Sequence, residues 1–479
     1  MVAMSSGRLL RMGTILAAGV LLAGCGTGAS NYAPAGAQSS TQGQTPATGQ
    51  AAAAGTAVPN AASGDKVHLV YFNARSAEAA ERALVNRYMQ DHPNIDIEYL
   101  STTSLNGPSD TDAIANLIFN IQAKKVIDVA KVEVSRTPLD LMDSGSIQEL
   151  TPIGGDALQT QLKGLLNNNY VNINNAVWAM PYEYDPFGYV YNADMFKDAG
   201  LNPDTPPTSW DQLRQVNDTL KAKNPNAWPI CMPINNLAKT MPWVWTSGGD
   251  YWDKTILPTK ADFTNQTVTD VYKFEQEWSQ KGWRNTDELN DTTTLQFMIS
   301  RKCAAVIYSS DEILQLEAND PKTDWRVAPI QSENGQGTPA TYGGGSALVI
   351  PSTAAHSKEA MDFIMWLTSD DGQRLKYGVT QGLNLADQDL YSQTNPDSMA
   401  VSDQLKNDPK WKQSILTVPS RPPGISPAFS KIYQLLADMQ ERIVRSNSDV
   451  TSELTNVQQQ AQPLLDQAVA NFPQLYQSK

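Results

Sequence analysis

The sequence has few of the residues that metal binding and nucleophilic catalysis use. It contains three cysteines and three histidines in 479 residues, and His68, His92 and His356 are far apart in the chain. No histidine lies next to a cysteine, and no Walker A or nucleophile-elbow pattern is present. We therefore expect no zinc site, no nucleotide-binding loop and no cofactor.

Positive charge and long apolar runs are also scarce. Asp and Glu number 50 against 36 Lys and Arg, which gives a formal net charge of −14. A chain this acidic is repelled by phosphate backbones, so nucleic acid is not an expected partner. Beyond the N-terminal segment, no apolar run is long enough to span a bilayer. The length predicts two or three domains, at roughly 100–200 residues each.

The N-terminus predicts export. Two arginines precede the apolar segment Met12–Leu22, which is too short for a stable membrane-spanning helix. The sequence LAGC follows at residues 22–25 and resembles the lipobox of bacterial lipoproteins. The resemblance implies that residues 1–24 are a signal peptide and that Cys25 is lipidated, which anchors the chain outside the cytoplasm on the bacterial cell membrane. An ordinary secretory signal with a chance cysteine is the alternative.

Residues 26–64 form a segment of low complexity. They contain no charged residue and consist mostly of Ala, Gly, Ser, Thr, Gln and Pro. Such a composition cannot bury enough apolar surface to offset the entropy lost on ordering. We therefore interpret residues 25–64 as the lipidated cysteine and a flexible tether with a random-coil reach of roughly 35 Å.

From residue 65 the apolar pattern alternates between strand and helix. Strands are predicted at Val67–Phe72, Ile95–Tyr99 and Val126–Val134, with helices at Ser76–Tyr88 and Ile114–Ile121. This β-α-β-α-β order is typical of a parallel sheet covered by helices, so we predict an α/β fold. Apolar stripes at Ala360–Leu367 and Phe429–Ile443 predict two further amphipathic helices.

Cys231 and Cys303 are the two cysteines that remain after Cys25. An oxidising exterior permits a disulfide between them. Whether they pair depends on the separation of their Cα atoms, which the sequence does not give, so the pairing stays open.

Several segments together resemble the extracellular solute-binding proteins that serve carbohydrate importers. They are HPNI at 92–95, LDLMDSGSI at 139–147, VWAMPY at 177–182, YNADMF at 191–196, PTSWDQL at 207–213, AAVIY at 304–308, GGG at 343–345, KEAMDFI at 358–364 and SDDGQ at 369–373. The resemblance extends over nearly all of residues 65–479. The order and spacing of the segments carry it, rather than any single segment.

The resemblance implies a two-lobed periplasmic-binding-protein-like fold of type II with a hinge between two α/β lobes. The first lobe is expected to contain residues 65–184 and 309–355, and the second residues 185–308 and 356–479. The chain would cross between the lobes near Tyr182–Pro186, Tyr308–Asp311 and 351–358. In this family the lobes close on a solute in the cleft, and the closed form delivers it to the permease subunits of an ABC importer. We expect a monomer that is not an enzyme.

A sugar site needs several hydrogen-bonding groups and flat aromatic rings. By resemblance, Asp185 lies at the first crossing, where a carboxylate accepts bonds from sugar hydroxyls; the alternative is a turn aspartate before Pro186. Trp243 and Trp245 are candidate aromatic platforms. They would share a face on a strand but not on a helix, so one of them could instead belong to the core.

The glycine-rich segment and its neighbours supply further candidates. Tyr342, Gly344 and Gly345 would border the cleft, since glycines permit close backbone approach to a ligand; the alternative is a simple turn. Arg421 matches a family position at which an arginine reaches ligand hydroxyls. Asp250 is a weaker candidate, because it could cap a helix or form a turn.

The last candidates follow predicted strands. Glu133 ends the third strand, where ligands sit on parallel sheets. Glu78 begins a helix, and the alternative role for its charge is to stabilise the helix dipole. Ser309 and Ser310 lie at the expected second crossing.

Two other functions fit the sequence. An exported glycoside hydrolase would use two carboxylates, and Asp and Glu are plentiful. A binding module could also serve a sensor rather than a transporter. If the chain serves a transporter, the several tryptophans and the long second lobe favour a disaccharide or a short oligosaccharide as the ligand.

Overall fold

The computed structural model describes residues 66–73, 78–101, 110–135, 137–165, 168–286, 290–380 and 418–476. These residues belong to one compact unit. The predicted signal peptide, Cys25 and the tether lie outside them. No helix within the described ranges is both long and apolar enough to cross a membrane.

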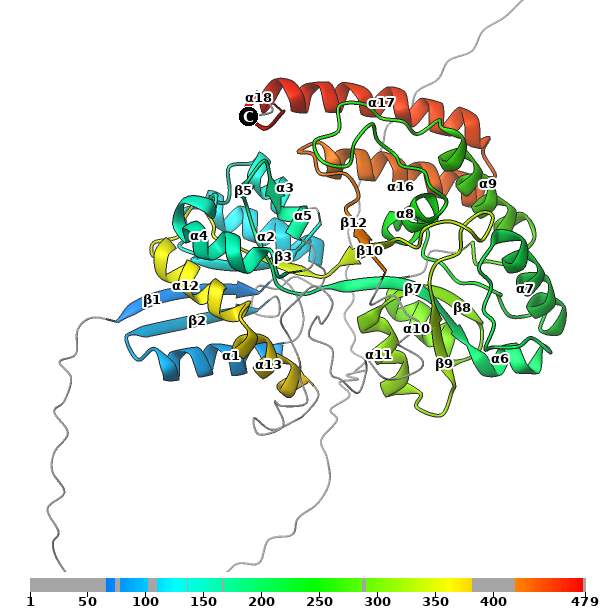
Figure 1. The fold of residues 1–479 in the computed structure, drawn as a ribbon, viewed down its shortest axis with the longest axis horizontal. Helices are drawn as coiled ribbons and strands as arrows, with labels where there is room; N and C mark the ends of the chain where they lie inside the picture. The colour runs from blue at the N-terminus through cyan, green and yellow to red at the C-terminus, as the bar shows by residue number, and fades with distance from the viewer. Residues whose placement is uncertain are drawn as a thin grey trace, which may run out of the picture. The chain divides into compact units, whose positions relative to one another are not determined.

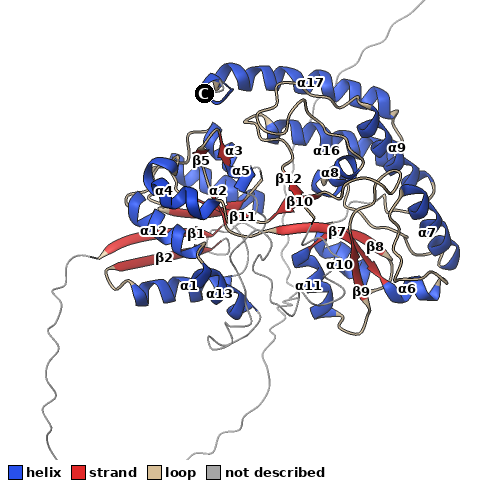
Figure 2. Cartoon of the chain, in the orientation of Figure 1, coloured by secondary structure: helices blue, strands red, loops and turns tan. Residues whose placement is uncertain are grey.

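The first sheet contains the predicted β-α-β-α-β unit. Its parallel strands and connecting helices are β1 (Val67–Asn73), α1 (Glu78–Asp91), β2 (Ile95–Ser101), α2 (Asp110–Gln122) and β3 (Val129–Glu133). The mixed α/β class is thereby confirmed (Figure 2). Two later strands pair antiparallel beyond β3, namely β11 (Ser346–Val349) and β6 (Met180–Pro181), to give the order β2-β1-β3-β11-β6.

The strand β3 begins three residues later than the sequence predicted. Asp128, directly before it, is buried, and its carboxylate accepts hydrogen bonds from the backbone N–H groups of Val70 (2.9 Å), Ala355 (2.9 Å) and His356 (3.0 Å). These bonds satisfy a buried charge and hold a turn rather than a strand at this point. They also fix the segment before α12 (Ser357–Leu367) to the first sheet.

Helices from distant parts of the chain cover the first sheet. They are α3 (Thr137–Asp143), α4 (Thr151–Leu162), α5 (Asn168–Val171), α12 and α13 (Asp370–Thr380), and the small hairpin β4 (Asn172–Ile173) and β5 (Ala176–Val177) lies among them. The predicted stripe of α12 is confirmed, because Ala360, Phe363, Ile364 and Leu367 are buried in the same hydrophobic core as β1 and β3. Figure 1 shows the yellow α12 beside the cyan α4.

The second sheet is built from other segments of the chain and has its own hydrophobic core. Its strands are β7 (Asp185–Asn192), β8 (Ala305–Ser309), β9 (Trp325–Ala328), β10 (Thr341–Gly344) and β12 (Ser420–Arg421), in the order β12-β10-β7-β8, with β9 pairing to β7. The helices of this half are α6 (Ala193–Asp198), α7 (Trp210–Lys223), α8 (Leu237–Thr246), α9 (Gln266–Gln280), α10 (Asp291–Ile299), α11 (Ser310–Asn319), α16 (Phe429–Ser446) and α17 (Val450–Asn471). The short α18 (Pro473–Tyr476) follows, and its Leu475 is buried in the core of the first sheet.

The PTSWDQL segment shows how the sequence builds one of these helices. Ser209 caps α7, and Gln212 returns a hydrogen bond to the backbone of the cap residue, which completes a capping box. Trp210 then turns inward and stacks on Phe274 of α9, with ring centroids 4.7 Å apart. The helix start and its anchor in the core are therefore set within four residues.

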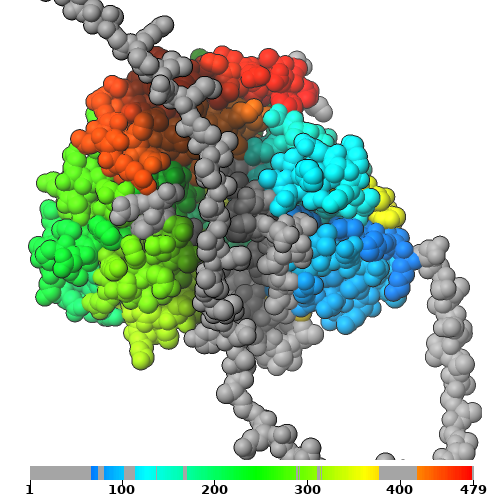
Figure 3. All heavy atoms as spheres, turned by 180° about the vertical axis from the view of Figure 1, so that it is seen from behind, coloured from blue at the N-terminus to red at the C-terminus, as the bar shows by residue number. Residues whose placement is uncertain are grey.

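The expected lobe boundaries need correction in two places. Residues 310–344 were expected in the first lobe, but β9 and β10 pair with β7 in the second sheet. Residues 357–376 were expected in the second lobe, but α12 and Leu375 of α13 lie in the first core. Accordingly, the chain does not cross after β8, and it returns to the first sheet at Gly345. Figure 3 shows the yellow residues beside the blue and cyan ones, and orange residues beside the green ones. We propose lobes of 66–184 with 345–380, and 185–344 with 418–476.

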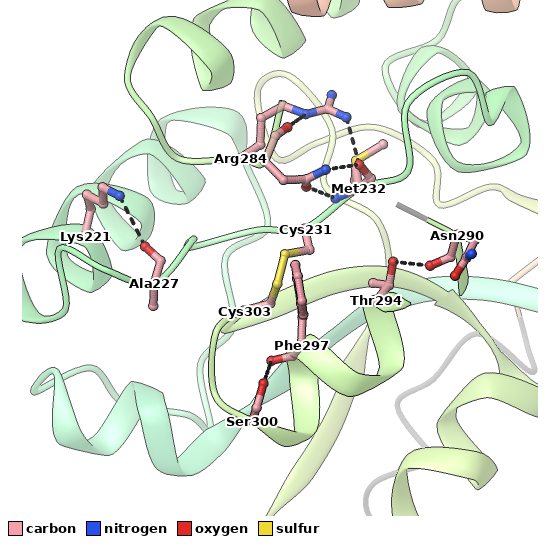
Figure 4. The surroundings of a disulfide bond; sticks show 11 residues. Lys221, Ala227, Cys231, Met232, Arg284, Asn290, Thr294, Phe297, Ser300 and Cys303 are labelled. Carbon is pink, nitrogen blue, oxygen red and sulfur yellow. Dashed lines mark hydrogen bonds between the residues drawn. A yellow bond between two sulfur atoms is a disulfide. The ribbon is translucent and has the colours of Figure 1, made fainter. Parts of the chain in front are cut away.

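The structure pairs Cys231 with Cys303, which the sequence left open (Figure 4). Their Cα atoms are 5.7 Å apart, and 72 residues separate them in the sequence. Both cysteines are fully buried. The Cys231 N–H also donates to the Ala305 carbonyl at 2.8 Å, so the disulfide fixes a neighbouring segment to the edge of β8.

We predict that this disulfide stabilises the second lobe by about 2–5 kcal/mol, because it closes a long loop in the unfolded chain. The double variant Cys231→Ala/Cys303→Ala should lower the free energy of unfolding by this amount in urea denaturation. As a second measurement, a reductant should lower the midpoint of the wild-type chain and leave the double variant unchanged. Equal wild-type midpoints with and without reductant would contradict the prediction.

Candidate functional site

The two sheets are joined by antiparallel strands that run side by side. On the first-sheet side, Pro181 in β6 pairs with Ala347 in β11. On the second-sheet side, Asp185 in β7 pairs with Gly344 in β10. The chain therefore leaves the first sheet just before Asp185 and returns to it just after Gly344.

The joining strands approach each other very closely at Gly345. The Ser346 carbonyl accepts hydrogen bonds from the N–H groups of Tyr182 (2.9 Å) and Glu183 (3.1 Å). Gly345 has φ of +114°, and a Cβ there would lie 2.1 Å from the Glu183 carbonyl oxygen. At Gly344, a Cβ would come within 3.2 Å of the facing backbone. These glycines thus allow the two joining strands to lie close to each other.

An ion pair lies in the second lobe near this junction. Nη2 of Arg421 is 2.5 Å from Oδ2 of Asp250, and the Arg421 guanidinium carbon is 5.7 Å from the centroid of the Trp245 ring. The Tyr251 N–H (2.7 Å) and the Thr255 hydroxyl (3.3 Å) also donate to the Asp250 carboxylate. The Arg421 and Asp250 side chains are 35% and 22% exposed, so a solute can reach both.

Hydrogen bonds connect this ion pair to the first lobe. Arg421 is the register partner of Tyr342, and the Tyr342 hydroxyl donates to Ser135 Oγ. Ser135 donates to Oε1 of Glu133 through its N–H (2.8 Å) and its hydroxyl (2.5 Å). The Tyr170 hydroxyl donates to the Arg421 carbonyl (2.8 Å). One polar network therefore contains five of the residues predicted from the sequence, namely Glu133, Trp245, Asp250, Tyr342 and Arg421.

Burial sets the protonation of this network. Burial raises the pKa of the Tyr170 phenol well above its usual value, so Tyr170 stays a neutral donor. Burial also raises the pKa of Asp250 above its usual value, and the attraction of Arg421 offsets this only in part. The network thus combines buried hydroxyls that donate to protein acceptors with one partly exposed carboxylate–guanidinium pair.

The two tryptophans have different environments because they lie on a helix, α8, and not on a strand. Trp243 belongs to an aromatic core with Phe274 and Trp278, whose ring centroids are 6.1 and 5.3 Å from its own. Trp245 is also buried in this core, at 3% exposed, but its ring faces Arg421. Because residues two apart on a helix point in different directions, the structure corrects the expectation for Trp243, which is a core residue.

The other predicted residues lie around the junction or outside the described side chains. Asp185 is the first residue of β7 and is half-buried, while Ser309 ends β8 and pairs with Phe187. The Phe187 ring packs edge-to-face against Tyr342, with centroids 5.7 Å apart. Glu78 and Ser310 begin α1 and α11, and their side chains lie outside those that the structure describes.

Sequence reasoning missed three members of the network, Ser135, Tyr170 and Thr255. Ser135 follows a predicted strand end, which was an available signal. Tyr170 and Thr255 lie in no motif, and only the fold brings them to Arg421 and Asp250. Among the described residues, no group of three or more His, Cys, Asp or Glu side chains could hold a metal ion.

Comparison with known proteins identifies the family. Residues 73–374 match the family described as bacterial extracellular solute-binding protein, and this is more than half of the chain. The chain belongs to this family. A probable amino-acid ABC transporter periplasmic-binding protein of Sinorhizobium fredii is 26% identical over 214 residues. The match covers 42% of this chain and 46% of that relative, so the chain spans less than half of its length.

Solved structures show the same fold. A solute-binding protein of Thermotoga lettingae bound with α-D-tagatose has a TM-score of 0.65 and 18% identity, and the match covers 84% of this chain and 100% of that one. UgpB of Mycobacterium tuberculosis in complex with glycerophosphocholine has a TM-score of 0.66 and 19% identity, with 85% and 100% covered. These similarities confirm the two-lobed periplasmic-binding-protein fold. The family and these neighbours are binding proteins rather than enzymes.

We predict that Gly345→Ala destabilises the chain by about 2 kcal/mol or more, because it adds a backbone clash to an unfavourable φ. Urea denaturation measures the change. The matched control is Gly145→Ala, since Gly145 also has a positive φ (+64°) but no atom lies within 4 Å of an added Cβ. The control should lose only about 1 kcal/mol. Equal losses in the two variants would show that close approach at Gly345 is not a constraint.

Proposed function

We propose that the chain is the solute receptor of an ABC importer and that it captures a sugar, a disaccharide or short oligosaccharide, by closure of its lobes. The observation that carries the proposal is the Asp250–Arg421 ion pair beside the Trp245 ring. A sugar hydroxyl can donate to the carboxylate and accept from the guanidinium at once. Trp245 is buried, and its ring lies against the Arg421 guanidinium, so in this proposal it supports the arginine while the solute contacts the ion pair.

The charge balance of this pair favours a neutral ligand. Asp250 already compensates the charge of Arg421, so an uncharged polyol can bind without leaving a charge unpaired. A free amino acid carries a carboxylate and an ammonium group, and each would compete with one partner of the pair. The tagatose bound to the Thermotoga protein is a sugar, and other structural neighbours are also sugar-binding proteins, which supports this ligand class.

Further contacts are proposed for residues around the junction. Glu133, Asp185, Ser309 and Tyr342 lie on strands that end or pair there. We propose the same role for Glu78 and Ser310, at the starts of α1 and α11. Gly344 and Gly345 act indirectly in this proposal, since they let the joining strands approach.

The N-terminus supports a lipid-anchored receptor. In this proposal residues 1–24 direct export, Cys25 carries the lipid, and residues 26–64 form the tether to the bacterial cell membrane. The folded part then works as a monomer near the permease subunits that accept the solute. The disulfide between Cys231 and Cys303 agrees with an oxidising compartment.

The ligand class is tested by thermal shift and calorimetry. We expect neutral sugars to raise the melting temperature, because a ligand at a hundredfold excess over its dissociation constant adds about 2.7 kcal/mol. Asp250→Asn should weaken sugar binding by about tenfold to hundredfold, since it removes a charged hydrogen-bond acceptor. The control, Asp211→Asn, removes the partner of a surface Arg214 pair and should bind normally.

Other outcomes of that screen would identify another ligand or contradict the site. A shift with amino acids or glycerophosphodiesters and none with sugars would overturn the sugar proposal and keep the fold. If Asp250→Asn bound sugar with unchanged affinity, the ion pair would not be part of the binding site. Release of product from a sugar substrate would instead favour a hydrolase.

The anchor is tested in a bacterial host grown with a clickable fatty acid. The wild-type chain should incorporate the label and fractionate with membranes. Cys25→Ser should lose the label and appear in the soluble extracytoplasmic fraction, because no other predicted segment binds the bilayer. Equal labelling of both forms would rule out Cys25 as the lipidated residue.

A further inference from the structure

Four charged side chains form a largely buried cluster in the first lobe, in which Glu183 is the most exposed at 30%, and the proposed binding site does not use them. Lys131 Nζ lies 3.0 Å from Oε1 of Glu81 and 2.8 Å from Oε1 of Glu183. Lys376 Nζ also contacts Oε1 of Glu183 and lies 3.7 Å from Glu81. The side chains of Glu81 and Lys131 are 0% exposed. Buried charges persist only when each is paired and hydrogen-bonded, and here two acids face two lysines.

Neutral groups complete the cluster. The hydroxyls of Tyr71 (2.9 Å) and Tyr182 (3.2 Å) donate to the second oxygen of Glu81. The Lys376 ammonium lies 3.8 Å from the centroid of the Tyr182 ring. Because these contacts are directional, the cluster holds its members at fixed positions in a way that apolar packing would not.

The cluster joins the segments by which the chain passes between the lobes. Glu183 lies on the first passage, one residue before Tyr184. Ser346, the first residue after the return at Gly345, donates through its hydroxyl to Oε2 of Glu183 at 2.6 Å. Lys376 lies on α13, the last described element of the first lobe before β12 resumes in the second sheet. One carboxylate therefore contacts both paired strands and α13, the helix that precedes the third connection.

The spacing leaves little chain free to rotate. Glu183 and Ser346 are held to the first lobe, whereas Asp185 and Gly344 are already paired in the second sheet. Only Tyr184 and Gly345 lie between these positions. On the two paired strands, rotation of one lobe against the other must therefore be absorbed at these two residues.

We propose that Glu183 is a positioning residue that fixes the first-lobe ends of the three connections, so that hinge motion is confined to Tyr184 and Gly345 on the two paired strands. The inference deepens the proposed function, since closure on a solute requires such a pivot. Burial opposes ionisation, but Lys131 and Lys376 outweigh it and hold the pKa of Glu183 well below its usual value. Glu183 therefore keeps its charge at neutral pH.

The test is hydrogen–deuterium exchange of the full chain without any ligand, so that its outcome does not depend on whether the solute is a sugar. Ser346→Ala removes only the hydroxyl that joins Ser346 to Glu183 and leaves all four charges in place. We expect the amides of Tyr182 and Glu183 to exchange about tenfold faster, as the loss of one hydrogen bond to a charged group implies. Amides in β1 should exchange as in the wild type.

The matched control is Ser146→Ala. Ser146 is a buried serine of the same lobe whose hydroxyl bonds to Ser144 Oγ at 2.7 Å, away from the connections. Ser146→Ala should leave the exchange rates of the amides of residues 182–183 unchanged. A second variant, Lys376→Arg, keeps the charge but changes the donor geometry and should accelerate the same amides, whereas Lys358→Arg on the surface of α12 should not. Glu183→Gln is less suitable, because an unbalanced buried charge can prevent folding.

Two results would overturn the proposal. One is equal exchange at residues 182–183 in Ser346→Ala and Ser146→Ala. The other is faster exchange throughout β1 and β3 to the same degree, which would mean that the cluster stabilises the lobe without positioning the connections.

Discussion

The close approach of two strands at Gly345 is the constraint on which the arrangement of this chain depends. The Glu183 carbonyl occupies the space in which any side chain at residue 345 would lie, and the Ser346 carbonyl accepts two backbone hydrogen bonds from the opposite strand. Because the strands are held so tightly there, the two sheets are separated by one residue between β10 and β11 and by three residues between β6 and β7. The polar network of Tyr342, Arg421 and Asp250 then lies in the strands and turns that follow.

Charge is used in two different ways on the two sides of this junction. In the first lobe, Glu81 and Lys131 are fully buried, Lys376 is 11% exposed, and Glu183 lies at the edge of the cluster with a side chain that is 30% exposed. Their charges compensate one another, and our proposal gives them a mechanical role. In the second lobe, Asp250 and Arg421 compensate each other while remaining partly exposed, which suits contact with a neutral solute. A buried pair costs desolvation and gains fixed geometry, whereas an exposed pair can exchange its hydrogen bonds with a ligand.

Local sequence patterns predicted the local structure well. The β-α-β-α-β unit and the stripe of α12 follow from the periodicity of apolar residues. The sequence could not predict which core would bury α12, because its apolar stripe fits either lobe. Trp243 was misplaced for a related reason, since the short apolar run around it fits a strand or a helix.

The parts of the site that sequence reasoning missed depend on long-range contacts. Tyr170 and Arg421 are 251 residues apart, and the Glu183 cluster draws on four separate elements. No spacing rule connects such residues. The glycines at 344 and 345 were noticed, but as a border of a ligand site rather than as the contact between strands. Only the facing backbone shows that role.

The most direct test of the central claim is a pair of crystal structures of the chain, with and without its bound solute, compared one lobe at a time. Each lobe should superimpose on itself, and the backbone dihedral changes on the paired strands should fall at Tyr184 and Gly345. The contacts of Glu183 with Lys131, Lys376 and Ser346 should be the same in both structures. Dihedral changes spread along β6 or β11, or a Glu183 carboxylate that changes partners on closure, would contradict the account.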